Sequence, residues 1–265
     1  FGLEKTVSYG GGTKNGPKEI IKASHQVELY DEELKCEPFK KIGIKTLKPF
    51  KISKKINKAI NQIAEINQKI LDNKLFPITL GGEHSITPGC IKPFVKKYKK
   101  LTLLHFDAHA DLRESYAGEK YSHASAIKRC IDHKNVSVVS FGIRNISAEE
   151  IPTLKKNKKR INIYWAKDKK KWDLNKFKKQ IKNKDVYITF DVDGLDSSIM
   201  PATGTPEPGG IFWDEALEII KIACKNSRIV GADVNELAPI KGFNSYNFLV
   251  AKLVYKILSY KFLLK

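Results

Sequence analysis

At residues 101–111 the chain reads LTLLHFDAHAD. The first six residues are mostly apolar, which is typical of a strand covered on both faces of a parallel sheet. Three ligand-type side chains follow at alternate positions, Asp107, His109 and Asp111. Because side chains of an extended segment alternate between two faces, these three point the same way. The stretch therefore predicts a buried strand that ends in a group of metal-binding or catalytic side chains.

Other short apolar runs predict five more strands, at residues 76–80, 136–141, 162–165, 186–190 and 229–234. Between the strands, isoleucines recur every three or four residues from Ile52 to Ile70 with lysines on the other side, which predicts a helix. Pro17 indicates the start of another helix, and residues 213–225 and 246–263 form two more. This alternation predicts one α/β domain, residues 1–265, around a mostly parallel sheet. The chain begins at Phe1 rather than Met, which leaves open that N-terminal residues are missing.

The composition limits the class of protein. The 265 residues include 48 Lys and Arg against 29 Asp and Glu, a net charge of +19. The lysines are scattered and form no arginine-rich track, so we expect no nucleic-acid partner. The four cysteines, at positions 36, 90, 130 and 224, make no Cys-x-x-Cys pair and predict reduced thiols in a cytoplasmic protein. No apolar run approaches the length of a membrane span, so we expect no membrane association.

Polar side chains also follow three of the other predicted strands. The strand at 76–80 runs into GGEHS at residues 81–85, which contains His84. Asp191 and Asp193 follow the strand at 186–190, and Glu236 follows the last strand. Ligands of open parallel sheets bind at the carboxyl ends of the strands. We therefore expect these groups to converge with Asp107 at one edge.

Clustered carboxylates repel one another unless a cation compensates their charge. Four carboxylates with two imidazoles suggest two divalent cations, and the oxygen-rich set favours Mn²⁺ over a thiolate zinc site. Taken singly, His84 is more simply a core histidine, and Asp107 and Asp191 are helix caps. Glu236 alone is equally a cap or a site residue. The metal interpretation rests on both alternating motifs lying directly after apolar strands.

Four ordered motifs carry a family resemblance: GGEHS at 81–85, FDAHAD at 106–111, FDVDGLD at 190–196 and PATGTP at 201–206. Together they resemble the ureohydrolases, which comprise arginases, agmatinases and their relatives. The resemblance extends from about Val7 to the last predicted helix. One departure is Glu83, which stands where the family usually has aspartate before the ligand histidine.

The resemblance implies a three-layer α/β/α fold, arginase-like, and a site with two Mn²⁺ ions per subunit. Such a pair of ions acidifies water, which then attacks a guanidinium group to release urea and an amine. Carried over by motif, one ion is bound by His84, Asp107, Asp111 and Asp191, and the other by Asp107, His109, Asp191 and Asp193.

Three residues receive catalytic roles from the same resemblance. Asp111 orients the nucleophile, and Glu236 holds the guanidinium through paired hydrogen bonds. His123, in YSHAS at residues 121–125, delivers a proton to the leaving amine, although by itself it could be a plain surface histidine. Family members are commonly trimers or hexamers, so we also expect a homo-oligomer.

The substrate is predicted from departures from the arginase pattern. Arg113 follows the ligands where arginases have a different polar residue, and Ser147 stands where they have an aspartate that binds the amino group. Both departures favour agmatine, hydrolysed to putrescine and urea, over arginine. Glu114, Glu119 and Glu150 are candidates to face a distal ammonium, or are solvated surface. Aminopropylagmatine, guanidinobutyrate and arginine stay open as alternatives, and a basic nucleic-acid-binding protein is the least favoured class.

Overall fold

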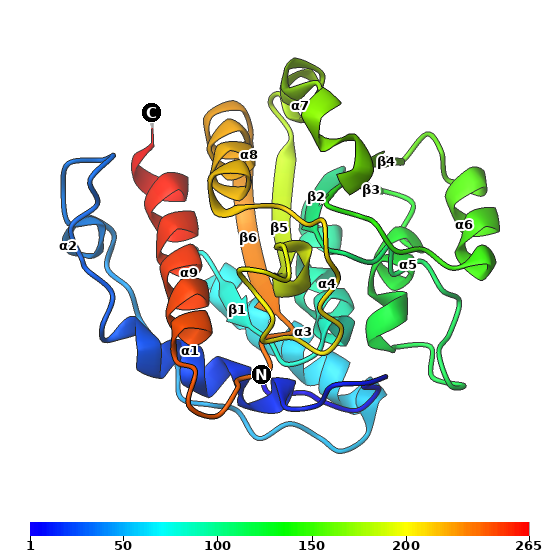
Figure 1. The fold of residues 1–265 in the computed structure, drawn as a ribbon, viewed down its shortest axis with the longest axis horizontal. Helices are drawn as coiled ribbons and strands as arrows, with labels where there is room; N and C mark the ends of the chain where they lie inside the picture. Colours follow the sequence, from blue (N-terminus) through cyan, green and yellow to red (C-terminus); the bar gives the residue numbers. More distant parts are fainter. Residues whose placement is uncertain (265) are drawn as a thin grey trace.

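The computed structural model describes residues 1–264 and shows one parallel sheet between two layers of helices (Figure 1). All neighbouring strands are parallel, in the order β1-β6-β5-β2-β3-β4. The mostly parallel sheet and the three layers are therefore confirmed. The strands are β1 (Ile78–Leu80), β2 (Leu101–Phe106), β3 (Val136–Phe141), β4 (Ile161–Tyr164), β5 (Asp185–Asp191) and β6 (Arg228–Asn235).

The helices occupy both faces of this sheet. In chain order they are α1 (Gly16–Ser24), α2 (Pro38–Ile42), α3 (Ile56–Asp72), α4 (Thr87–Lys97), α5 (Ala126–Ile131), α6 (Ile151–Lys156), α7 (Leu174–Ile181), α8 (Trp213–Asn226) and α9 (Ser245–Leu263). One apolar core contains buried residues of α3, α4 and α5, and the other contains buried residues of α7, α8 and α9. Among the described residues, no helix combines the length and apolar character needed to cross a membrane.

Strand β2 shows how the two cores share one strand. Leu101 and Leu103 pack into the core of α3, α4 and α5, whereas Leu104 and Phe106 pack into the core of α7, α8 and α9. All six residues of β2 are buried. A strand between two helical layers therefore needs apolar residues at nearly every position, and a polar residue such as His105 stands out.

Two predicted boundaries are wrong by a few residues. The first strand begins at Ile78, because Pro77 has no N–H to donate to a neighbouring strand. The helix predicted from Ile52 begins at Ile56, and its buried face includes Asn67. The Asn67 side chain donates to the Ile63 carbonyl, 3.0 Å away, so a polar residue is tolerated on the apolar face.

Helices α3 and α4 approach closely at Gly89, and this contact generates a stability prediction. A Cβ at Gly89 would lie 2.7 Å from the carbonyl oxygen of Ile60 in α3. We expect Gly89→Ala to lower the free energy of unfolding by about 1–3 kcal/mol despite the higher helix propensity of alanine. Urea unfolding measures this, with exposed Lys96→Ala in the same helix as the control. An unfolding midpoint equal to or above that of the parent would contradict the close packing.

Candidate active site

The carboxyl ends of four neighbouring strands, β1, β6, β5 and β2, bring the predicted side chains to one edge of the sheet. After β1 the chain turns sharply through Gly82, where a Cβ would lie 2.1 Å from the carbonyl oxygen of Leu3. The backbone N–H of Glu236, after β6, donates to the Gly82 carbonyl at 2.7 Å. The glycine turn therefore lets three distant segments of backbone meet beside the site.

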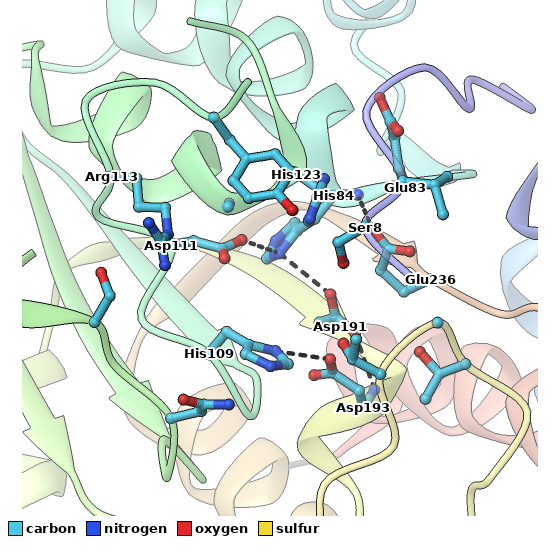
Figure 2. Close-up of a pocket in the computed structure, with 18 of the residues that line it drawn as sticks. Ser8, Glu83, His84, His109, Asp111, Arg113, His123, Asp191, Asp193 and Glu236 are labelled. Carbon is cyan, nitrogen blue, oxygen red and sulfur yellow. Dashed lines mark hydrogen bonds and ion pairs between the residues drawn. The ribbon is translucent and has the colours of Figure 1, made fainter. Parts of the chain in front are cut away.

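A pocket of ≈ 250 Å³ opens at this edge. Figure 2 shows the side chains of His84, Asp111, Asp191, His109 and Asp193 pointing toward one another from separate strand ends and loops. Asp107 is fully buried and lies behind the wall, in contact with His84 and His109. The predicted residues that line the pocket are His84, His109, Asp111, Arg113, His123, Ser147, Glu150, Asp191, Asp193 and Glu236.

His84 is surrounded by carboxylate oxygens. Its Nδ1 lies 3.0 Å from Asp107 Oδ2, 3.0 Å from Asp111 Oδ2 and 3.4 Å from Asp191 Oδ2, yet it makes no hydrogen bond. In an octahedral shell with metal–oxygen distances of about 2.1 Å, neighbouring ligand atoms lie about 3 Å apart. The spacing of these four groups, and the unpartnered buried nitrogen, fit a divalent cation.

A second group forms around His109. Its Nδ1 lies 2.9 Å from Asp193 Oδ2 and 3.6 Å from Asp107 Oδ1. Backbone N–H groups hold the neighbouring carboxylates, with Ala108 N donating to Asp193 Oδ1 and Asp193 N donating to Asp191 Oδ1, both at 2.9 Å. These hydrogen bonds use the Oδ1 atoms of Asp191 and Asp193, so the Oδ2 atom of each remains for another partner. Asp107 contacts both histidines, as expected of a residue between two cations.

The charge distribution without a cation is strained. Burial, followed by repulsion from Asp107, raises the pKa of Asp111 to about 7. Burial and the neighbouring Asp193 and Asp107 raise the pKa of Asp191 well above its usual range. Burial lowers the pKa of His84, but its contacts with Asp107 and Asp111 outweigh burial and raise it well above the usual range. Divalent cations bound among these side chains would supply the positive charge that relieves this repulsion.

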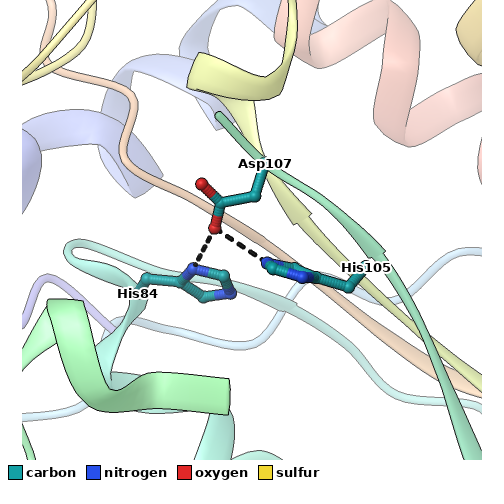
Figure 3. A group of neighbouring side chains, drawn as sticks. All are labelled: His84, His105 and Asp107. Atoms are coloured by element: carbon teal, nitrogen blue, oxygen red, sulfur yellow. Dashed lines mark hydrogen bonds and ion pairs between the residues drawn. The ribbon is translucent and has the colours of Figure 1, made fainter. Parts of the chain in front are cut away.

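Three further side chains support His84 and Asp107, and sequence analysis missed them. Figure 3 shows the rings of His84 and His105 directed at the same oxygen of Asp107, with His105 Nε2 at 2.8 Å. On the other side, His84 Nε2 contacts Thr189 Oγ1 at 2.9 Å, and Thr189 donates to Asp233 Oδ1 at 2.7 Å. His105 and Thr189 each stand two positions before a predicted metal ligand in a buried strand, Asp233 stands three positions before Glu236, and these spacings were the signal available.

Asp111 and Glu236 both have backbone conformations in the left-handed region, with φ of 51° and 65°. Such conformations are costly for residues with a side chain and tend to occur at functional sites. Glu236 Oε1 accepts a hydrogen bond from the His84 backbone at 2.6 Å. Burial, with the charge of Glu83 next in size, raises the pKa of Glu236 well above its usual range.

His123 lines the pocket. Within residues 1–264, its side chain makes no hydrogen bond to a predicted metal ligand. Its Nδ1 lies 3.0 Å from Thr6 Oγ1, and the ring of Tyr116 meets it edge-on with centroids 5.2 Å apart. Burial, reinforced by the positive charges of His109 and His84, lowers the pKa of His123 to about 4. The imidazole is therefore held in place by groups outside the metal-binding cluster.

The residues predicted to select the substrate form ion pairs and hydrogen bonds within the protein. Arg113 pairs with Glu149 at 2.8 Å, and not with Glu114 or Glu119. Ser147 donates its backbone N–H and its hydroxyl to Glu150 Oε2, while the other Glu150 oxygen accepts from Leu112 N. Glu150 thus braces the loop after Asp111.

Glu114 and Glu119 make other contacts. Glu114 binds Arg129 and Lys128, which lower its pKa to about 2. Glu119 accepts from the backbone of Tyr121 at 3.0 Å. Neither side chain lines the pocket, so the structure does not place them as partners of a distal ammonium.

A family model described as the arginase family matches residues 1–259. The chain belongs to the arginase family. Members of this family depend on two metal ions, and the His/Asp cluster of the structure provides side chains for them. The chain is a ureohydrolase, a hydrolase that acts on small guanidino compounds, and within the family it is close to the agmatinases.

Individual relatives of this arginase-family chain differ in the substrate that their names give. An agmatinase of Bacillus anthracis is 38% identical over 248 residues, which cover 90% of this chain and 81% of the relative. An N(1)-aminopropylagmatine ureohydrolase of Synechocystis sp. is 32% identical over 266 residues, 97% of this chain and 86% of the relative. The crystal structure of agmatine ureohydrolase of Thermoplasma volcanium superimposes with a TM-score of 0.87 at 30% identity, covering 97% of this chain and 86% of that one.

The contact between Thr189 and His84 generates a prediction about metal affinity. Thr189→Val keeps the shape of the side chain but removes the hydroxyl that fixes the His84 ring. We expect the dissociation constant for Mn²⁺ to rise roughly 10–100-fold, as when other supports of metal ligands are removed. Competition with a fluorescent chelator measures it. Thr102→Val is the matched control, because that hydroxyl contacts Ser137 instead; equal affinities of the two variants would contradict the role of Thr189.

Proposed function

We propose that this ureohydrolase hydrolyses agmatine to putrescine and urea, with Mn²⁺ as its metal. The observation that carries the substrate is the ion pair between Arg113 and Glu149 at 2.8 Å. Among the described residues that line the pocket, Arg113 is the one lysine or arginine, and its Nη1 donates to the carboxylate of Glu149. Glu149 would therefore compete with an α-carboxylate for this guanidinium, whereas agmatine has no carboxylate to place there. The 38% identity to an agmatinase supports the same substrate.

The metal-binding residues follow from the two groups in the site. His84, Asp107, Asp111 and Asp191 would hold one ion, and Asp107, His109, Asp191 and Asp193 the other. Carboxylate oxygens with two imidazoles and no thiolate suit Mn²⁺. Bound divalent cations would supply a hydroxide nucleophile near neutral pH by lowering the pKa of water.

The remaining pocket residues act on the substrate. Guanidinium is a resonance-stabilised cation and a poor electrophile, so it needs firm orientation. Glu236 would bind two of its N–H groups, and Asp111 would orient the nucleophile by hydrogen bonding. His123, which hydrogen-bonds Thr6 and no proposed metal ligand among residues 1–264, would take up the proton released by the attacking water and pass it to the departing amine. These three roles divide binding, attack and departure among separate side chains.

We further propose a cytoplasmic location, which the four unpaired cysteines support. The homo-oligomer, a trimer or hexamer, stays a prediction. Aminopropylagmatine is the second candidate substrate, because the Synechocystis relative named for it matches 97% of this chain. That compound shares the guanidino end of agmatine and differs at the amine end.

Urea release from a panel of guanidino compounds tests the substrate. With Mn²⁺ added, we expect kcat/KM for agmatine to exceed that for arginine by roughly 10²–10⁴-fold, because the carboxylate of arginine is desolvated without a partner. Aminopropylagmatine and guanidinobutyrate complete the panel, and chelated enzyme is the blank. Arginine hydrolysed as well as agmatine would overturn the agmatine proposal and leave the ureohydrolase activity standing.

Replacement of the proposed proton donor is a second test. His123→Ala should lower kcat by roughly 10²-fold or more, as general acids usually contribute, with the bound metal unchanged. Metal content by elemental analysis accompanies the kinetics. A variant that loses its metal, or that turns over at the parent rate, would count against a proton-transfer role for His123.

A further inference from the structure

Glu83 holds the N-terminal segment beside the pocket through hydrogen bonds to its backbone. One oxygen of its carboxylate, Oε2, accepts hydrogen bonds from the backbone N–H groups of Lys5 at 2.9 Å and Thr6 at 2.8 Å. The other oxygen, Oε1, accepts from the hydroxyl of Ser85 at 2.7 Å. Glu83 is 1% exposed, so both oxygens are occupied within the protein. This clamp leaves Thr6 with a fixed backbone beside the active site.

The side chain of Thr6 reaches His123, which lies 117 positions away in the chain. Thr6 Oγ1 accepts a hydrogen bond from the backbone N–H of His123 at 3.0 Å, and the same oxygen lies 3.0 Å from Nδ1 of the imidazole ring. One hydroxyl therefore holds both the backbone and the ring of this residue. Tyr116, whose ring meets the imidazole edge-on, limits it from another side.

We infer that Thr6 is a positioning residue, which fixes the orientation and tautomer of His123 so that Nε2 faces the substrate, and that Glu83 holds Thr6 in place. The inference rests on the proposed role of His123 as proton donor. It concerns a residue outside all four family motifs, and it gives a task to Glu83, the position at which this chain departs from the usual aspartate.

The chemistry of the hydroxyl fits this task. A proton donor alternates between imidazolium and neutral imidazole, and the imidazolium can only donate hydrogen bonds. A threonine oxygen has two lone pairs, so it accepts from the His123 backbone and from Nδ1–H together. With Nδ1–H retained in both states, the proton that is exchanged belongs to Nε2. Thr6 thus supports the ring before and after proton transfer without rearranging.

The Thr6 hydroxyl matters because, among the described residues, no other side chain hydrogen-bonds His123. Without the Thr6 hydroxyl, the ring keeps only its contact with Tyr116, which does not determine which nitrogen faces the pocket. Proton transfer requires the donor within hydrogen-bonding reach of the leaving nitrogen, and small misplacements slow such steps strongly. The hydrogen bonds of Thr6 within residues 1–264 go to Glu83 and His123 and not to the proposed metal ligands, so metal content should not change.

Kinetics of three variants test this inference. Thr6→Val removes the hydroxyl at nearly constant volume, and we expect kcat to fall by about 10-fold with KM within about 2-fold. Thr6→Ser keeps the hydroxyl and should restore most of kcat. Lys5→Ala, whose exposed side chain lies in the same segment, is the matched control and should keep the parent kcat. Metal content and thermal unfolding are measured for each variant.

A double variant separates the inference from the proposed function. If Thr6 acts through His123, then Thr6→Val should slow His123→Ala no further, because the two effects are not additive. Additional slowing in the double variant, or an unchanged kcat in Thr6→Val while His123→Ala is impaired, would overturn the role of Thr6 alone. If His123→Ala retains the parent kcat, the proposed proton donor fails. The ¹⁵N shifts of the His123 ring in parent and Thr6→Val then decide whether Thr6 sets its tautomer, and identical shifts would overturn the inference.

Discussion

Buried like charges are the constraint on which this structure depends. Asp107, Asp111, Asp191 and Asp193 are each less than 9% exposed and lie within a few ångströms of two histidines. Burial and mutual repulsion raise the pKa values of Asp111 and Asp191, so the group is not stable as four free carboxylates. Divalent cations remove this conflict, and the rest of the fold can be understood as the scaffold that keeps the ligands together.

The scaffold works through the edge of the parallel sheet. Strands β1, β6, β5 and β2 end side by side, so residues from four distant parts of the sequence meet at one edge. Arg144 secures one loop of this edge by donating to the carbonyls of Asp193, Leu195 and Glu207. Glu150 secures another through Leu112, and Glu83 ties down the N-terminal segment. These carboxylates and this guanidinium hydrogen-bond backbone groups and so hold the loops around the pocket together.

Sequence patterns predicted the sheet and the convergence of the strand ends, because apolar runs followed by alternating Asp and His carry a local signal, and the family resemblance implied the three layers. The residues that hold the site side chains in place were harder to recognise from the sequence. His105 and Thr189 are single polar residues within buried strands, and only their contacts with Asp107 and His84 distinguish them from ordinary core residues. The bond of Thr6 to His123 joins residues 117 apart, and no local pattern reveals it. Arg113, Ser147 and Glu150 line the pocket, but their partners depend on side-chain conformations that spacing does not determine.

The central claim is that the strand ends form a site for two divalent cations. Anomalous diffraction from crystals of the Mn²⁺-loaded protein, recorded at the manganese edge, tests it most directly. The account predicts two anomalous peaks, one beside His84 and Asp111 and one beside His109 and Asp193, with Asp107 and Asp191 contacting both. A single peak, or manganese bound elsewhere with these side chains unliganded, would contradict it.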